Sequence, residues 1–214
     1  MSKLISIKSD PRAYIMSIMY GLHNNLIRRF STFRCRLKMR LWGIKFGKNC
    51  SFRGNMIFNR APGSTISMGN DCRFNSNSRF NYRGINHPSI LQTQSGGGIF
   101  IGDNCGFSGV SIISGCSVTI GNNVLCGANV SIGDRNNHEN IFKGFEPAPV
   151  TIGDNVWVGM NSVIMRGVSI GENTIIGANS IVTKNIPANV IAVGTPCKIV
   201  KEREISNESA STDI

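Results

Sequence analysis

Three side chains in this sequence can exchange protons near neutral pH, namely His23, His87 and His138. Imidazole accepts and returns a proton readily in that range, so each is a candidate general base. His138 lies in a polar segment, four residues after Asp134 and two after Asn136. A carboxylate or carbonyl on its second ring nitrogen would fix the tautomer. Asp134 is predicted either to orient His138 or to cap the loop, and a histidine in a polar loop, taken alone, is more often a surface histidine.

The segment directly after this loop repeats every six residues. From Ile152 each block opens with a β-branched aliphatic residue: Ile152, Val158, Ile164, Ile170, Ile176 and Val182. The fifth position is small or β-branched in five of the six blocks: Val156, Ser162, Val168, Thr174 and Ser180. Neither a helical period nor simple strand alternation gives this register. The pattern predicts a parallel β-solenoid in which both positions face inward and Gly, Asn and Asp form the turns.

Fainter blocks begin at Phe46, so we predict a solenoid domain over residues 46–200. Two stretches break the register and predict excursion loops, near residues 86–98 and over residues 133–149. Functional residues concentrate on such loops because a rigid scaffold holds their ends. Residues 201–214 are polar and are expected to form a disordered tail.

The positive charge is concentrated in an N-terminal arm, residues 1–45. Residues 1–48 hold eleven Lys/Arg and one acid, a net +10 of the +11 carried by the whole chain. The pair Asp10-Pro11 is typical of a helix start. Apolar residues then recur at spacings of three and four, which predicts one helix, or two helices broken near Ser31-Thr32, with an apolar face. The face comprises Ile15, Met19, Leu22, Leu26, Phe30, Phe33, Leu37 and Leu41.

Two interpretations of this amphipathic arm stay open. The helix packs on the solenoid or on a trimer partner with a solvated basic face, or residues 10–45 make peripheral contact with an anionic membrane. No motif indicates nucleic-acid binding. The sequence shows neither a secretory signal nor 18 consecutive apolar residues, which favours a cytoplasmic, optionally membrane-peripheral location.

The seven cysteines have no metal-binding spacing. Cys50, Cys72 and Cys105 fall on fifth positions of repeat blocks and Cys126 on a first position. We interpret them as small core residues of a protein in a reducing compartment, and we expect no metal site.

Over residues 99–200 the chain resembles the hexapeptide-repeat acyltransferases, especially the galactoside, maltose and nodulation-type O-acetyltransferases and the sugar acetyltransferases of polysaccharide clusters. The string from Pro149 to Val200 matches that family block for block, and Asp134-Arg-Asn136-Asn-His138 is similar to its D-x-D-x-H loop, with Asn for the second acid. The resemblance implies an all-β, left-handed parallel β-helix, a homotrimer with active sites between subunits, and a role in polysaccharide biosynthesis.

The resemblance also implies a reaction. His138 would be the general base that takes a proton from a sugar or glycan hydroxyl, which then attacks acetyl-CoA directly, without an acyl-enzyme and without a metal. Trp157 would border the acceptor groove beside Asp134 and Asn136. The implied acetyl-CoA contacts are Met160, Ala178, Thr183, Lys184, Lys198 and Lys201. Alternatives left open are acyl transfer to an amino sugar or a drug by the same fold, and a non-catalytic β-helix scaffold.

Overall fold

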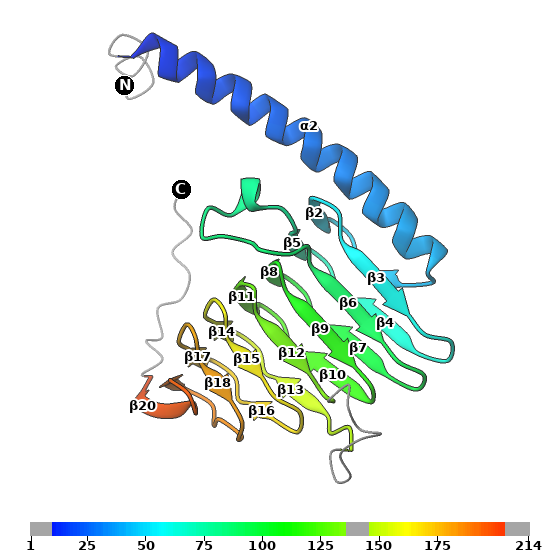
Figure 1. Ribbon diagram of the computed structural model, residues 1–214, viewed down its shortest axis with the longest axis vertical. Coiled ribbons are helices and arrows are strands. Elements are labelled where there is room, and N and C mark those ends of the chain that lie inside the picture. The colour runs from blue at the N-terminus through cyan, green and yellow to red at the C-terminus, as the bar shows by residue number, and fades with distance from the viewer. Residues whose placement is uncertain (1–9, 136–145, 204–214) are drawn as a thin grey trace.

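The computed structural model describes residues 10–135 and 146–203, which form a left-handed parallel β-helix preceded by one long helix, α2 (Pro11–Leu41) (Figure 1). The chain winds in triangular coils, and each coil gives one strand to each of three parallel sheets. The first sheet contains β1 (Lys45–Phe46), β4 (Thr65–Met68), β7 (Gly98–Ile101), β10 (Ser117–Ile120), β13 (Val150–Ile152) and β16 (Ser169–Ile170).

The second sheet contains β2 (Ser51–Arg53), β5 (Arg73–Asn75), β8 (Gly106–Ser108), β11 (Leu125–Ala128), β14 (Trp157–Val158), β17 (Ile175–Ile176), β19 (Val190–Val193) and β20 (Lys198–Glu202). The third contains β3 (Ile57–Arg60), β6 (Ile90–Thr93), β9 (Ser111–Ser114), β12 (Ser131–Gly133), β15 (Val163–Ile164) and β18 (Ile181–Val182). All pairs within the sheets are parallel except β19 with β20, which is antiparallel and ends the second sheet.

The core consists of the positions that the six-residue period places inside. All six block heads from Ile152 to Val182, and the five small or branched fifth positions, are at most 2 % exposed. Each side chain stacks on its equivalent one coil away, as Ile152 does on Ile170 through the β13–β16 register. In the earlier coils the stacked residues are aromatic, with ring centroids of Phe52 and Phe74 5.7 Å apart and those of Phe74 and Phe107 4.7 Å apart. The prediction for the repeat core is confirmed.

The turns are held by asparagines in the left-handed region. Asn123, Asn155 and Asn173 occupy one corner with φ of 57°, 57° and 55°. Asn tolerates this conformation better than other side chains with a Cβ. Their amides form a ladder, in which Nδ2 of Asn123 donates to Oδ1 of Asn155 at 3.0 Å and Asn155 donates to Asn173 at 3.0 Å. The repeated asparagine thus serves both the turn and the stacking of coils.

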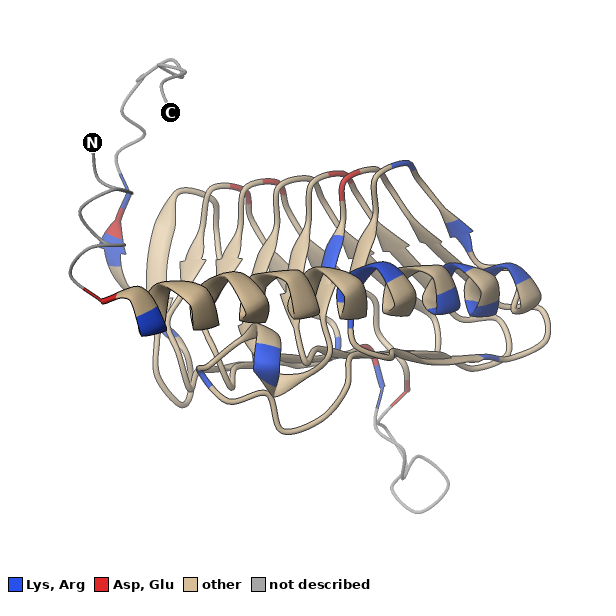
Figure 2. Cartoon of the chain, turned by 90° about the horizontal axis from the view of Figure 1, so that it is seen from above, with Lys and Arg blue, Asp and Glu red and all other residues tan. Residues whose placement is uncertain are grey.

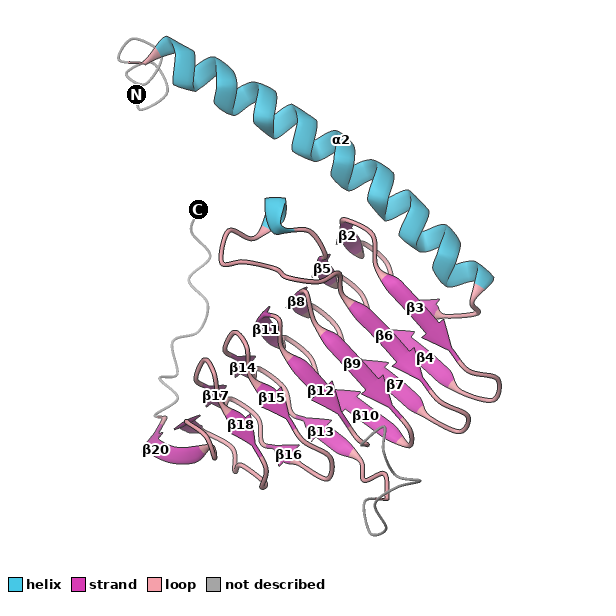
Figure 3. Ribbon diagram, viewed as in Figure 1, coloured by secondary structure: helices cyan, strands magenta, loops and turns pink. Residues whose placement is uncertain are grey.

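The first excursion was misplaced by the sequence pattern. It spans residues 76–89, between β5 and β6, and contains the 3₁₀ helix η1 (Ser78–Phe80), the short cyan turn between pink loops in Figure 3. Most of the predicted loop 86–98 is instead the strand β6, a turn, and the start of β7. Phe74 and Phe80 are six residues apart and therefore suggest two further repeat blocks. In the structure, Asn77 and Asn81 instead cap the two ends of η1, and the Asn81 side chain holds a turn by accepting from the Arg83 N–H. Ser89 and Thr93 occupy buried positions that an aliphatic residue would have marked.

The second excursion leaves the coil between β12 and β13, as predicted. Its ends are joined, because the Ala148 backbone N–H donates to the Asp134 carbonyl at 2.8 Å. Arg166 of the next coil donates through Nη1 to the Glu146 carbonyl at 2.8 Å. His138 and Asn136 lie outside the described residues.

The arm is one unbroken helix, capped by the Asp10 carboxylate, which accepts from the Ala13 N–H. Near the point where a break was considered, Ser31 Oγ donates to the Phe52 carbonyl at 2.6 Å, and Thr32 Oγ1 accepts from the Phe52 N–H at 3.0 Å. These bonds cover the free edge of β2, the first strand of the second sheet. The buried face of α2 is therefore Ser31, Cys35 and Met39, and the predicted apolar face does not pack on the solenoid.

The cysteine prediction is confirmed for the core positions. Cys50, Cys72, Cys105 and Cys126 are buried and all seven cysteines are free thiols. Among the described residues no helix is long and apolar enough to cross a membrane.

Candidate functional site

A row of exposed apolar side chains marks the outer face of the second sheet. Trp157 alternates with the buried Val158 on β14 and is 53 % exposed. The register places Leu125 of β11 on one side of Trp157 and Ile175 of β17 on the other. Because successive residues of a strand point to opposite faces, burying Val158 in the core obliges Trp157 to face outward.

Stacked glycines form part of the corner that follows this row. Gly127, Gly159 and Gly177 stack at the turn from the second to the third sheet. A Cβ on Gly159 would collide with the backbone nitrogen of Ala178, and one on Gly127 would lie 2.6 Å from the nitrogen of Met160. The glycines let neighbouring coils approach closely, and the corner beside Trp157 stays open as a result.

The open corner forms a groove of about 410 Å³. Trp157, Met160 and Ala178 line it together, so the structure unites one predicted acceptor-side residue with two predicted acetyl-CoA contacts. Among the described residues, no hydrogen-bond acceptor is assigned to the backbone N–H groups of Met160 and Ala178. The groove therefore has an apolar floor and is lined by residues from stacked coils.

Asn81 and Arg83 form the facing wall of the groove, and sequence analysis missed both. They belong to the excursion 76–89, which Asn129 holds against the corner by donating from Nδ2 to the Gly84 carbonyl at 2.8 Å. Two features of the sequence could have indicated this loop. Consecutive block heads lack an aliphatic residue, and the stretch contains several Asn and Gly residues, which are typical of loops.

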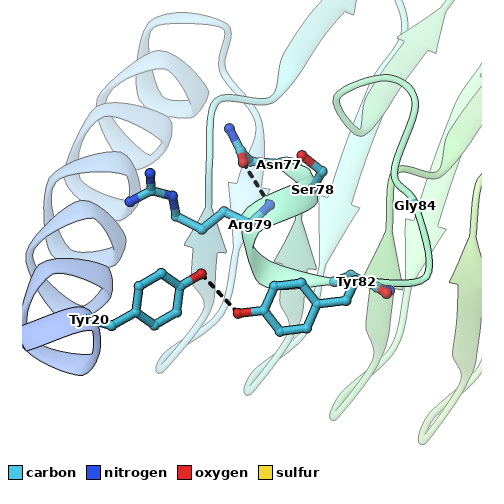
Figure 4. A pocket seen from close by; sticks show the side chains of 7 residues that line it. Tyr20, Asn77, Ser78, Arg79, Tyr82 and Gly84 are labelled. Carbon is cyan, nitrogen blue, oxygen red and sulfur yellow. Dashed lines mark hydrogen bonds between the residues drawn. The ribbon is translucent and has the colours of Figure 1, made fainter. Parts of the chain in front are cut away.

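The same excursion meets α2 on its other side. Tyr20 of the helix and Tyr82 of the loop share a hydrogen bond of 2.9 Å between their hydroxyls, and the Arg79 guanidinium lies 6.0 Å from the Tyr20 ring centroid (Figure 4). The open pocket between them has a volume of about 560 Å³, and Asn81 lines both this pocket and the groove. The loop thus links the helix to the groove.

Lys198 and Lys201 lie on β20, at the C-terminal edge of the same sheet. They pair with Val193 and Ile191 of β19, which itself adjoins β17 at the groove. Both side chains are exposed. The two predicted phosphate contacts therefore share a sheet with Trp157.

Thr183 and Lys184 lie elsewhere in the chain. They follow β18 at the corner between the third and first sheets, exposed to solvent. The excursion 133–149 leaves from that same corner, since it joins β12 to β13. Within one chain the corner with this loop and the corner with the groove are different corners of the triangle.

Asp134 has a defined structural task. Its side chain is fully buried and accepts three hydrogen bonds, from Ser114 Oγ at 2.7 Å and from the backbone N–H groups of Gly115 at 2.6 Å and Cys116 at 2.9 Å. Asp134 thus holds the turn of the preceding coil under the excursion. Its predicted role in orienting His138 remains a prediction.

The other two histidines lie apart from Trp157. His23 is exposed on α2, and His87 is half-buried with Nδ1 3.0 Å from the Pro88 carbonyl oxygen. Among the described residues no cluster of His, Cys, Asp or Glu could hold a metal ion.

Comparison with known proteins agrees with this architecture. Residues 149–184 match the family model described as bacterial transferase hexapeptide (six repeats). The chain is 45 % identical over 97 residues to galactoside O-acetyltransferase from Escherichia coli strain K12, a match that covers 44 % of this chain. It spans about half of that relative's length, 48 %.

Two solved structures share the fold. A variant of AntD, an N-acyltransferase from Bacillus cereus in complex with dTDP and coenzyme A, aligns with a TM-score of 0.58 at 18 % identity, over 78 % of this chain and 88 % of that one. A hexapeptide-repeat acetyltransferase from Vibrio cholerae aligns with a TM-score of 0.53 at 23 % identity, over 87 % and 90 %. The chain belongs to the hexapeptide-repeat transferase family.

Proposed function

We propose that this protein is an acetyl-CoA-dependent O-acetyltransferase that transfers an acetyl group to a hydroxyl of a sugar or glycan, for use in polysaccharide biosynthesis. The observation that carries the proposal is the groove beside Trp157, which has an apolar floor and is lined by Met160 and Ala178, whose backbone N–H groups have no assigned acceptor among the described residues. Similarity to galactoside O-acetyltransferase over 97 residues supports the choice of acceptor.

The groove fits the chemical character of acetyl-CoA. A pantetheine arm is a slender chain with amide carbonyls, which suit the two N–H donors and the apolar floor. Lys198 and Lys201 extend the same sheet with positive charge suitable for nucleotide phosphates. Acetyl-CoA supplies the activated acyl carbonyl as a thioester. The backbone N–H of Met160 is a candidate donor to that carbonyl oxygen as negative charge develops on it.

His138 is the proposed base. It would accept the proton of the acceptor hydroxyl as the oxygen attacks the carbonyl carbon, and return the proton to the departing sulfur as the C–S bond breaks. One nitrogen of one histidine suffices for both transfers, and no covalent enzyme intermediate is needed. Asn81, Arg83 and Trp157 would contact the acceptor from the wall and floor of the groove.

The complete site requires more than one chain in this proposal. The loop that carries His138 leaves one corner of the triangle together with Thr183 and Lys184, whereas Trp157, Met160 and Ala178 lie at another. A symmetric trimer can place the loop corner of one chain against the groove corner of the next, because cyclic symmetry joins two different surfaces. The proposed site therefore lies between subunits.

The experiment is an acetyl-CoA consumption assay against simple sugars, nucleotide sugars, lipid-linked glycans and amino sugars. We expect turnover with a hydroxyl acceptor, and a loss of about 10²–10⁴-fold in kcat for His138→Ala, with acetyl-CoA still bound. The matched control is His87→Ala, which removes an imidazole from the described loop at residues 76–89 and should retain wild-type turnover.

Two results would contradict the proposal. Transfer only to an amine would replace O-acetylation by N-acylation, and wild-type turnover by His138→Ala would remove His138 from the base role. A separate variant tests the groove independently of any acceptor. Ala178→Trp should lose acetyl-CoA binding, as measured by calorimetry.

A further inference from the structure

The outward face of α2 carries an apolar stripe that none of the described residues covers. Its eight members, Ile15, Met19, Leu22, Leu26, Phe30, Phe33, Leu37 and Leu41, are between 49 % and 79 % exposed. At 1.5 Å per residue the stripe is about 40 Å long. An apolar surface of this length on a soluble domain normally marks a docking site.

The solenoid lies on the opposite side of the helix. Ser31, Cys35 and Met39 form the buried face, and Phe33 and Leu37 lie about half a turn from Ser31 and Cys35. In Figure 1 α2 runs along the outside of the molecule, with the solenoid on one side only. A flat surface can therefore reach the stripe without meeting the described solenoid.

The helix that bears the stripe is strongly basic. Residues 11–41 contain seven Lys/Arg and no Asp or Glu, and Figure 2 shows blue at the N-terminal end of the helix and through its C-terminal half, where six of the seven lie. The exposed arginines are Arg12, Arg29, Arg34 and Arg40. They neighbour the stripe at helical spacing, as Arg34 does with its guanidinium carbon 5.5 Å from the Phe30 ring centroid. No ion pair to an acid is seen for these four arginines within the part of the chain that the structure describes.

We propose that α2 is a membrane-docking helix that lies in the plane of an anionic lipid surface, with the stripe among the acyl chains and its arginines at the phosphates. Charge complementarity selects this occupant. A symmetric contact between copies of α2 would bring arginines together with no acid to offset them, and residues 49–214, with twelve Lys/Arg and eleven acids, offer no acidic surplus. Anionic headgroups supply the missing charge, and acyl chains take the apolar side chains.

The docking has a consequence for the groove. Tyr20 of α2 is bonded to Tyr82 of the loop 76–89, and this loop forms the groove wall through Asn81 and Arg83. A bilayer bound by α2 would thus lie near the loop that borders the groove.

The test is co-sedimentation of the full-length protein with vesicles of phosphatidylcholine alone or mixed with phosphatidylglycerol. We expect binding to the anionic vesicles that weakens as salt is added. Leu26→Asn should reduce the partition coefficient about tenfold or more. Arg29→Gln and Arg34→Gln should each reduce it about fivefold. The matched control is Ile57→Asn, because Ile57 is also an exposed aliphatic, 47 % exposed on β3, but lies on the solenoid.

Equal binding to both vesicle types, or undiminished binding by Leu26→Asn, would overturn the proposal. So would a Leu26→Asn protein whose oligomer dissociates in sedimentation velocity while the wild type ignores vesicles, because a second copy would then cover the stripe. Circular dichroism verifies that each variant is folded. None of these measurements depends on transferase activity, so failure here leaves the proposed function standing.

Discussion

At the scale of single residues, Asp134 shows that a residue of a sequence motif can have a structural role. Its carboxylate accepts three hydrogen bonds from residues 114–116 and is fully buried, so it fixes the turn of the preceding coil, next to the start of the excursion 133–149. The sequence left its role open between orienting His138 and capping the loop. The observed bonds give the carboxylate a structural task, since its two oxygens match the Ser114 hydroxyl and two adjacent N–H groups, and its role toward His138 stays a prediction.

Cys126 gives a prediction on pH. Its side chain is packed between coils, and burial raises the pKa of the thiol from its ordinary 9.0 to about 12. Between these two values the folded chain keeps a proton that the unfolded chain releases, so stability falls as pH rises. We expect the free energy of unfolding in urea to fall more steeply above about pH 9 for the wild type than for Cys126→Val. Parallel profiles for the two proteins would show that Cys126 ionises normally in the fold.

At the scale of elements, the corner glycines set the spacing of the coils. Gly159→Ala places a Cβ against the backbone nitrogen of Ala178, a rigid neighbour. We expect a loss of about 1–3 kcal/mol in the free energy of unfolding, measured by urea denaturation. Gly21→Ala is the control, because nothing lies within 4 Å of its Cβ in α2. That change should stabilise the protein by about 0.5–1 kcal/mol. Similar behaviour of the two variants would contradict close coil stacking.

The repeat elements were predictable and the irregular ones were less so. From Ile152 to Val182 each inward position repeats at a fixed interval, and local sequence alone determines which residues are buried. The loop 76–89 was missed because Phe74 is the buried residue of β5, and Phe80, six residues later, looked like another block head. The orientation of α2 depends on the hydrogen bonds of Ser31 and Thr32 to β2. It could not be predicted, because polar residues that form tertiary contacts leave no periodic signal in the sequence.

At the scale of the whole molecule, the candidate site is divided between corners. The family resemblance assigned Trp157, Met160 and Thr183 to one predicted site, and these residues follow one another along the chain. The triangular coil separates them, with Trp157 and Met160 at the groove and Thr183 at the corner of the loop 133–149. In the proposed trimer the two corners meet across a subunit boundary, and no single-chain pattern encodes that arrangement.

The activity of mixed trimers most directly tests the proposal that each site is shared between two chains. His138→Ala removes the base and Ala178→Trp fills the groove, so each variant alone should be inactive. Co-assembled in equal amounts, they should regain about one quarter of wild-type turnover, because each site takes His138 from one chain and Ala178 from the next. Turnover of the co-assembled trimers no higher than that of the separately assembled variants would place both residues in one chain's site and contradict the account.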